Sequence, residues 1–177
     1  MTMTGKRILF YCAFGERSAM AVQAALRRSG QDDVKRSGAN RMGAVTVVTF
    51  RSDPLFPKIS RVVAIILEKN KVVRPIDVLI GMQLLSRDDL EEWCRGRVPY
   101  LEKAINCNLS RLSRLLRILR FHVHDLKLVP SATAYLRHGS GPKQRLRFTK
   151  TGDAKLEKAY STHFVWPGKG PWPPPGP

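Results

Sequence analysis

Apolar residues recur at helical spacing through much of the second half of the chain. The longest such pattern follows Pro99 and continues to about His124. Its apolar positions are Leu109, Leu112, Leu116, Leu119 and Val123. At about 100° per residue they fall within an arc of about 80°, which predicts a helix with one narrow buried seam. Arg114 lies opposite this seam, with Arg111 and Arg117 about 60° to either side of it.

Shorter helices are predicted before this one. Residues 58–70 carry apolar side chains at helical spacing, and Pro75 suits the first turn of a helix that continues to Leu84. Ser86 is the expected N-cap of the next helix, because acidic residues occupy its first turn as in a capping box. Gly96 is the natural stop of that helix.

Strands are predicted over shorter segments. Residues 6–11 and 45–50 are apolar or β-branched strand candidates. Segments 135–138 and 143–148 flank a Gly-Ser-Gly-Pro turn, and together they predict a β-hairpin. Two further short helices are expected, at residues 18–28 and 151–160.

These elements predict an α+β, mainly α chain in four parts. A strand, a cysteine loop and a helix form a fragment at residues 1–30, and residues 31–52 have the composition of a linker. A helical domain with the β-hairpin follows at residues 53–165. Residues 166–177 contain six prolines, so they are expected to form a disordered tail that extends neither a helix nor a sheet.

The charge balance points to polyanionic partners. The 177 residues include 31 Lys+Arg and 14 Asp+Glu, a formal net charge of +17. Residues 106–150 alone hold ten basic residues and one acidic residue. Such a field favours nucleic acid or another polyanion. No apolar run approaches the length of a membrane span, so no membrane partner is expected.

The cysteines exclude two architectures. Cys12, Cys94 and Cys107 are odd in number and unevenly spaced, which argues against a disulfide scaffold. No Cys-x-x-Cys pair is present, so a zinc ribbon is excluded and no metal or cofactor is expected. Free thiols fit a reducing, cytoplasmic location.

One segment near the N-terminus has its own chemistry. An apolar strand leads into Cys12, and a helix is expected to begin near Ser18. The backbone N–H groups of such a loop and the helix N-terminus favour a thiolate or a bound anion, and Arg17 adds a full positive charge. Gly15 lets the backbone turn where a side chain would clash.

The pattern Cys-x-x-Gly-x-Arg-Ser at Cys12–Ser18 resembles the active-site loop of rhodanese-like sulfurtransferases over about residues 6–26. The resemblance implies that Cys12 takes sulfur as a persulfide from a small donor such as thiosulfate, which Arg17 holds. The loop residues that would cradle the sulfur are Ala13, Phe14, Gly15, Glu16 and Ser18. Most strands of a rhodanese domain precede this loop, and only eleven residues precede it here. The segment is therefore either an active site or a relic fused to an unrelated basic domain.

The alternative function is nucleic-acid binding by a winged-helix-like module without enzymatic activity. The expected order of three helices and a hairpin fits such a module. Its candidate phosphate contacts are Arg111, Arg114, Arg117, Arg137, Lys143, Arg145 and Arg147. The candidate recognition helix at residues 86–95 opposes this interpretation, because its four carboxylates would repel phosphate. Segments 72–80, 93–101 and 146–153 resemble a compact bacterial domain family without an assigned function.

Overall fold

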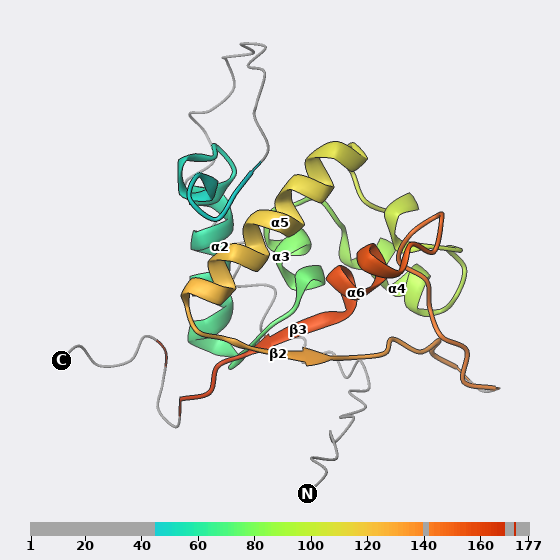
Figure 1. The fold of residues 1–177 in the computed structure, drawn as a ribbon. Helices are drawn as coiled ribbons and strands as arrows, with labels where there is room; N and C mark the ends of the chain where they lie inside the picture. Colours follow the sequence, from blue (N-terminus) through green and yellow to red (C-terminus); the bar gives the residue numbers. More distant parts are fainter. Residues whose placement is uncertain (1–44, 140–141, 169–171, 173–177) are drawn as a thin grey trace, which may run out of the picture.

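The structure is a computed structural model that describes residues 45–139, 142–168 and 172 (Figure 1). It is a mainly helical α+β fold, as the sequence predicts. In chain order the elements are η1 (Phe50–Ser52), α2 (Phe56–Lys69), β1 (Val72–Val73), α3 (Pro75–Gly81), α4 (Arg87–Cys94), η2 (Leu101–Lys103), α5 (Leu109–Asp125), β2 (Val129–Ala132), α6 (Ala154–Ser161) and β3 (Thr162–Val165). The predicted fragment at residues 1–30 lies outside the described residues.

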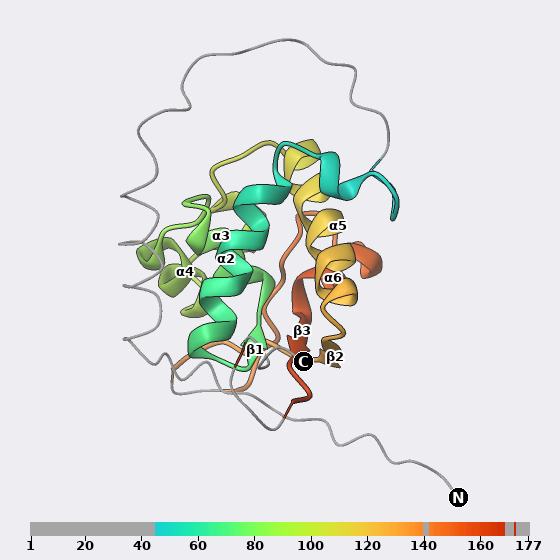
Figure 2. The same ribbon diagram turned by 90° about the vertical axis from the view of Figure 1, so that its left-hand side faces the viewer.

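Three short strands form one antiparallel sheet in the order β1-β3-β2. The last strand is the central one, because Phe164 of β3 pairs with Val73 of β1 and with Pro130 of β2. Directly after β3, the backbone N–H of Trp166 donates to the carbonyl of Lys71 over 2.7 Å. Figures 1 and 2 show the sheet at the lower end of the molecule, below the helices. The sheet therefore ties the first part of the domain to its last part.

Helices and aromatic side chains together form the core. α2 buries its whole predicted apolar stripe, which consists of Ile59, Val62, Val63, Ile66 and Leu67. The largest fully buried side chains are aromatic: Trp93, Tyr160, Phe50 and Phe148. The rings of Phe148 and Tyr160 stack with centroids 5.4 Å apart, and Trp93 lies 5.2 Å from Phe148. Burial of these rings holds α4, α6 and the segment before α6 together.

The predicted strand at residues 45–50 is wrong. The segment turns instead, because the N–H of Phe50 donates to the carbonyl of Thr46 over 3.0 Å. Thr46 and Thr49 also exchange backbone-to-hydroxyl hydrogen bonds, which satisfy groups that a strand partner would otherwise bind. Val45 is buried and Phe50 is only 1% exposed. The packed unit therefore includes residues that the sequence analysis assigns to the linker.

The predicted helix at residues 99–124 is interrupted. Its first part forms only the short helix η2, and contacts with a distant segment hold the chain that follows: the N–H of Asn106 donates to the carbonyl of Leu84 over 2.7 Å. α5 then has a start of its own, because the side chain of Asn108 accepts from the N–H of Arg111 over 2.8 Å. This N-cap fixes where α5 begins.

The buried arc of α5 is wider than the predicted seam. Leu115 and Ile118 are fully buried in addition to four of the five predicted residues, whereas Leu109 is 59% exposed in the first turn. η1 packs against α5 and covers part of this wider arc. The centre of the exposed face therefore lies nearer to Arg117 than to Arg114.

The predicted β-hairpin forms only in part. Its two segments run antiparallel and meet in one isolated bridge, Leu136 with Arg145. The N–H of His138 donates to the carbonyl of Cys94 over 2.8 Å instead of continuing a ladder. Contacts with the end of α4 thus limit the hairpin pairing to this one bridge. The regular strands are β1, β2 and β3, none of which is predicted from the sequence.

The first part of the predicted disordered tail packs against the domain. The rings of Trp166 and Trp172 meet edge to face with centroids 4.8 Å apart. Both side chains are half-buried and contact the core. These two tryptophans therefore belong to the packed unit, since their burial stabilises the fold.

Candidate nucleic-acid interface

The predicted cysteine site, with Cys12, Arg17 and the loop at residues 13–18, lies outside the described residues. Of the two cysteines that the structure describes, Cys94 is buried and Cys107 is half-buried. Burial raises the pKa of the Cys107 thiol, and the Arg111 charge opposes this with a smaller effect. A raised pKa and burial both disfavour a reactive thiolate. Burial therefore disfavours both cysteines of the described residues as nucleophiles.

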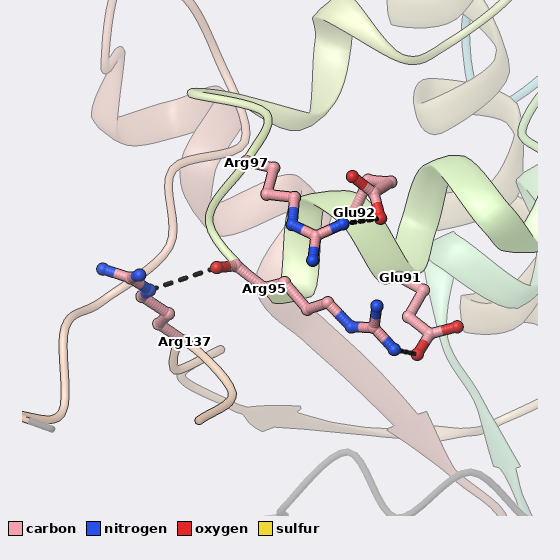
Figure 3. A network of polar contacts seen from close by, with 5 residues as sticks. All are labelled: Glu91, Glu92, Arg95, Arg97 and Arg137. Atoms are coloured by element: carbon pink, nitrogen blue, oxygen red, sulfur yellow. Dashed lines mark hydrogen bonds and ion pairs between the residues drawn. The ribbon is translucent and has the colours of Figure 1, made fainter. Parts of the chain in front are cut away.

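The segment at residues 137–150, which is rich in cationic side chains, packs with its start against the C-terminal end of α4. The side-chain Nε of Arg137 donates to the carbonyl of Arg95 over 3.1 Å (Figure 3), next to the hydrogen bond between His138 and Cys94. Gly96 makes room for this contact, because a Cβ there would lie 2.9 Å from the Nε of Arg137. With φ of +77°, Gly96 ends α4 in the left-handed region, as the sequence predicts.

Arg147 anchors the other end of this segment. Its carbonyl accepts from the indole Nε1 of Trp93 over 2.8 Å and from the N–H of Leu101 over 3.1 Å. The carboxylate of Glu157 accepts from the N–H groups of residues 148 and 149. Both ends of the segment are thus hydrogen-bonded to the helical core.

The charge of this segment has one sign. Residues 137–150 contain five cationic side chains and no acidic one. These are Arg137, Lys143, Arg145, Arg147 and Lys150, and all five are exposed. Together with Arg95 and Arg97, which are also exposed, we call them the α4 surface.

Two carboxylates of α4 are paired with arginines of this surface. Glu91 forms an ion pair with Arg95, and Glu92 forms one with Arg97 over 2.8 Å (Figure 3). Such exposed pairs add little stability. They nevertheless place a positive charge beside each carboxylate and so weaken its repulsion of phosphate. Two of the four acidic residues of α4 are therefore a smaller obstacle to a nucleic acid than the sequence implies.

The three predicted arginines of α5 do not have equal roles. The Nε of Arg114 lies 2.5 Å from the Oδ2 of Asp53, whose side chain is 2% exposed. Arg111 and Arg117 are exposed. Because its charge is offset by a buried carboxylate, Arg114 is a structural partner of Asp53 and is withdrawn from the candidate phosphate contacts.

The predicted phosphate contacts belong to two different parts of the fold. Arg137, Lys143, Arg145 and Arg147 belong to the segment bonded to α4, whereas Arg111 and Arg117 belong to α5. Figure 2 shows α4 on the left of the molecule and α5 on the right. Three further cations, Arg95, Arg97 and Arg120, are exposed but are not singled out by the sequence pattern. The first two become relevant only through tertiary packing, but Arg120 extends the three-residue spacing of the α5 arginines.

The described residues contain no group of three or more His, Cys, Asp or Glu side chains that could hold a metal ion. Of the helices in this part of the chain, none has both the length and the apolar character needed to cross a membrane. No family model, curated protein or solved structure matches the chain.

Proposed function

We propose that the protein binds nucleic acid through the α4 surface. The observation that carries this proposal is the 137–150 segment, which contains five cationic side chains and no acidic residue, and whose backbone is hydrogen-bonded to α4 at its start and to Leu101 near its end. Side chains on a held backbone lose less conformational freedom on binding. Arginine and lysine contacts to phosphate position a protein on a nucleic acid.

The order of elements supports the same function. β1, α3 and α4 are followed by the antiparallel strands β2 and β3, with β3 between the other two. This order fits a winged-helix-like arrangement, in which the segment between the last two strands contacts the phosphate backbone beside a helix. Two helices are additions to that arrangement: α5, between α4 and β2, and α6, between β2 and β3.

The test compares the affinity of the full chain for duplex and single-stranded oligonucleotides across a salt series. The variant K143Q/R145Q removes two charges from the α4 surface. We expect weaker binding and a salt slope that falls by roughly two units, because each lost phosphate contact lowers the slope by about one. The matched control is K58Q/K69Q, which removes two exposed charges from α2 and should leave the slope unchanged.

Two results would contradict this proposal. Equal losses in K143Q/R145Q and K58Q/K69Q would mean that net charge, rather than the α4 surface, attracts the nucleic acid. Competition by polyglutamate as strong as that by an unlabelled oligonucleotide would assign the surface to an acidic protein instead.

The motif at Cys12 favours a second function, sulfur transfer. The thiolate of Cys12 would attack the outer sulfur of thiosulfate, so that an S–S bond forms at Cys12 while the S–S bond of thiosulfate breaks and sulfite leaves. Cyanide would then take the outer sulfur of the persulfide as thiocyanate and restore the thiolate. Arg17 would hold the anionic donor. The buried or half-buried state of Cys94 and Cys107 supports Cys12 as the nucleophile.

Thiocyanate formation from thiosulfate and cyanide tests this second function. We expect activity in the wild type, loss in C12S, and retention in C94S and C107S. Replacement of Arg17 by Gln should raise KM for thiosulfate, because the arginine binds the donor. A wild type without activity would leave the segment as a relic.

A further inference from the structure

α5 presents a second polar stripe that the proposed function does not use. Its members are Ser110, Ser113, Arg117, Arg120 and His124, which recur every three or four residues and are all exposed. They lie on the side of α5 opposite its buried leucines, since this spacing keeps residues on one helix face. From Ser110 to His124 the stripe is about 21 Å long.

The charges on this stripe are not offset by nearby carboxylates. Arg117 and Arg120 form no ion pair within the described part of the chain. The nearest acidic residue on the helix, Asp125, is paired with Arg51 over 2.7 Å. Asp53, beside the same helix, is paired with Arg114. The stripe therefore keeps its positive potential, because its neighbouring acids already have partners.

Small hydroxyl side chains complete the stripe. Ser110 and Ser113 occupy the first turns of α5, where the helix dipole favours an anion. Serine hydroxyls donate hydrogen bonds to phosphate oxygens, and their size lets a nucleic-acid backbone approach closely. On each strand of a duplex, charges repeat about every 3.4 Å, so a stripe of about 21 Å spans roughly six phosphates.

The stripe and the start of the α4 surface, which is bonded to the end of α4, lie on different sides of the molecule. α4 and α5 lie on opposite sides of the molecule in Figure 2, and the 137–150 segment is bonded to α4. A single duplex that reached both would have to bend around the domain, and sharp bending of a short duplex is unfavourable.

We propose that the α5 stripe is a second nucleic-acid-binding surface, so that one molecule bridges two separate duplex segments. This inference rests on the proposed function of the α4 surface. It adds a class of activity, the bridging of nucleic acids, which a single cationic surface does not provide.

The experiment captures one duplex through another. A duplex of about 25 base pairs, short enough to stay rigid, is fixed to beads; the full chain is bound to it, and a second, fluorescent duplex of the same length is added. We expect wild type and K58Q/K69Q to retain the second duplex. We expect R117Q/R120Q to bind the fixed duplex with an affinity within about twofold of wild type and to lose capture of the second.

Three results decide between the possibilities. If R117Q/R120Q captures the second duplex like wild type, the stripe does not bind nucleic acid and the inference is overturned. If wild type binds the fixed duplex but never captures a second one, bridging alone is overturned. If wild type binds no duplex at all, the proposed function fails and this inference fails with it. Circular dichroism of each variant confirms that it is folded.

Discussion

At the residue scale, the carboxylate of Asp53 connects two helices. Its Oδ2 accepts from Arg114 on α5, and its Oδ1 accepts from the N–H of Leu55 over 2.9 Å, directly before α2. The side chain of Asp53 is almost fully buried. Loss of its cationic partner would leave a buried carboxylate with one donor fewer, and such a group is costly to keep out of water.

We therefore expect R114Q to lower the free energy of unfolding by about 1–3 kcal/mol. The control R117Q, on the exposed face of the same helix, should change it by less than about 0.5 kcal/mol. Urea denaturation at neutral pH measures both, and the double variant D53N/R114Q should be less destabilised than the sum of the single variants. Similar values for R114Q and R117Q would mean that the ion pair contributes nothing.

His163 is a buried histidine whose surroundings favour the neutral imidazole over the protonated one. Its Nε2 lies 2.7 Å from the hydroxyl of Tyr135. Burial, and to a smaller extent the positive charge of Arg74, lower its pKa from 6.5 to about 4. Between these values the unfolded chain binds a proton that the folded protein does not. The contribution of neutral His163 to the free energy of unfolding is therefore fully present above pH 6.5. It is lost as the pH falls toward the pKa of the folded state.

We expect this linkage to be visible as acid sensitivity. Between pH 7.5 and pH 4 the wild type should lose no more than about 3 kcal/mol through His163. H163Q, which keeps an amide for Tyr135, should lose less over the same interval. Because burial also lowers the pKa of His122, the informative quantity is the difference between wild type and H163Q. Parallel pH profiles for the two proteins would show that His163 is not the titrating group.

At the element scale, Gly96 both ends α4 and leaves room for the Arg137 side chain of the cationic segment. Alanine at Gly96 meets two costs: a φ of +77° and a Cβ 2.9 Å from the Nε of Arg137. The first cost is about 1–2 kcal/mol, and the second requires the Arg137 side chain to move. The position of the Arg137 side chain on the α4 surface is therefore coupled to Gly96, the residue that ends α4.

A double-mutant cycle measures this coupling. We expect G96A/R137A to be less destabilised than the sum of G96A and R137A, because removal of the arginine removes the clash. The matched control is G152A/R137A, since Gly152 also has a positive φ but its Cβ would meet Arg147 instead. Those two changes should be additive. Additivity in the Gly96 cycle would show that Arg137 does not occupy the space beside the glycine.

At the scale of the whole molecule, the position of Phe50 sets where the domain begins. Its ring lies 5.4 Å from that of Phe56 and 5.7 Å from that of Phe121, so it fills a site between η1, α2 and α5. We expect a chain that begins at Val45 to unfold cooperatively. A chain that begins at Asp53 should be less stable by about 3–5 kcal/mol, the usual cost of deleting a buried phenylalanine ring. Thermal denaturation of the two truncations checks this, and equal midpoints would place the boundary after Phe50.

The sequence alone determined the elements whose causes are local. The apolar stripe of α2, the proline that opens α3, the Ser86 cap of α4 and the glycine after it all lie where the sequence predicts them. Each of these signals acts over a few residues, through backbone geometry or a hydrogen bond between near neighbours in the chain. The excess of positive charge in residues 106–150 is likewise a property of the sequence.

Only the tertiary structure decided the features that join distant segments. Phe164 pairs with Val73 and Pro130 in a sheet that no local pattern indicates, and Asn106 bonds to Leu84 where a continuous helix is expected. Asp53 removes Arg114 from the exposed cations, while α4 gathers Arg137 and its neighbours onto one surface. The spacing of residues determines which side chains share a face of one helix or strand. Which faces are covered, and which charges are offset, depends on partners far away in the chain, and those are chosen when the core packs.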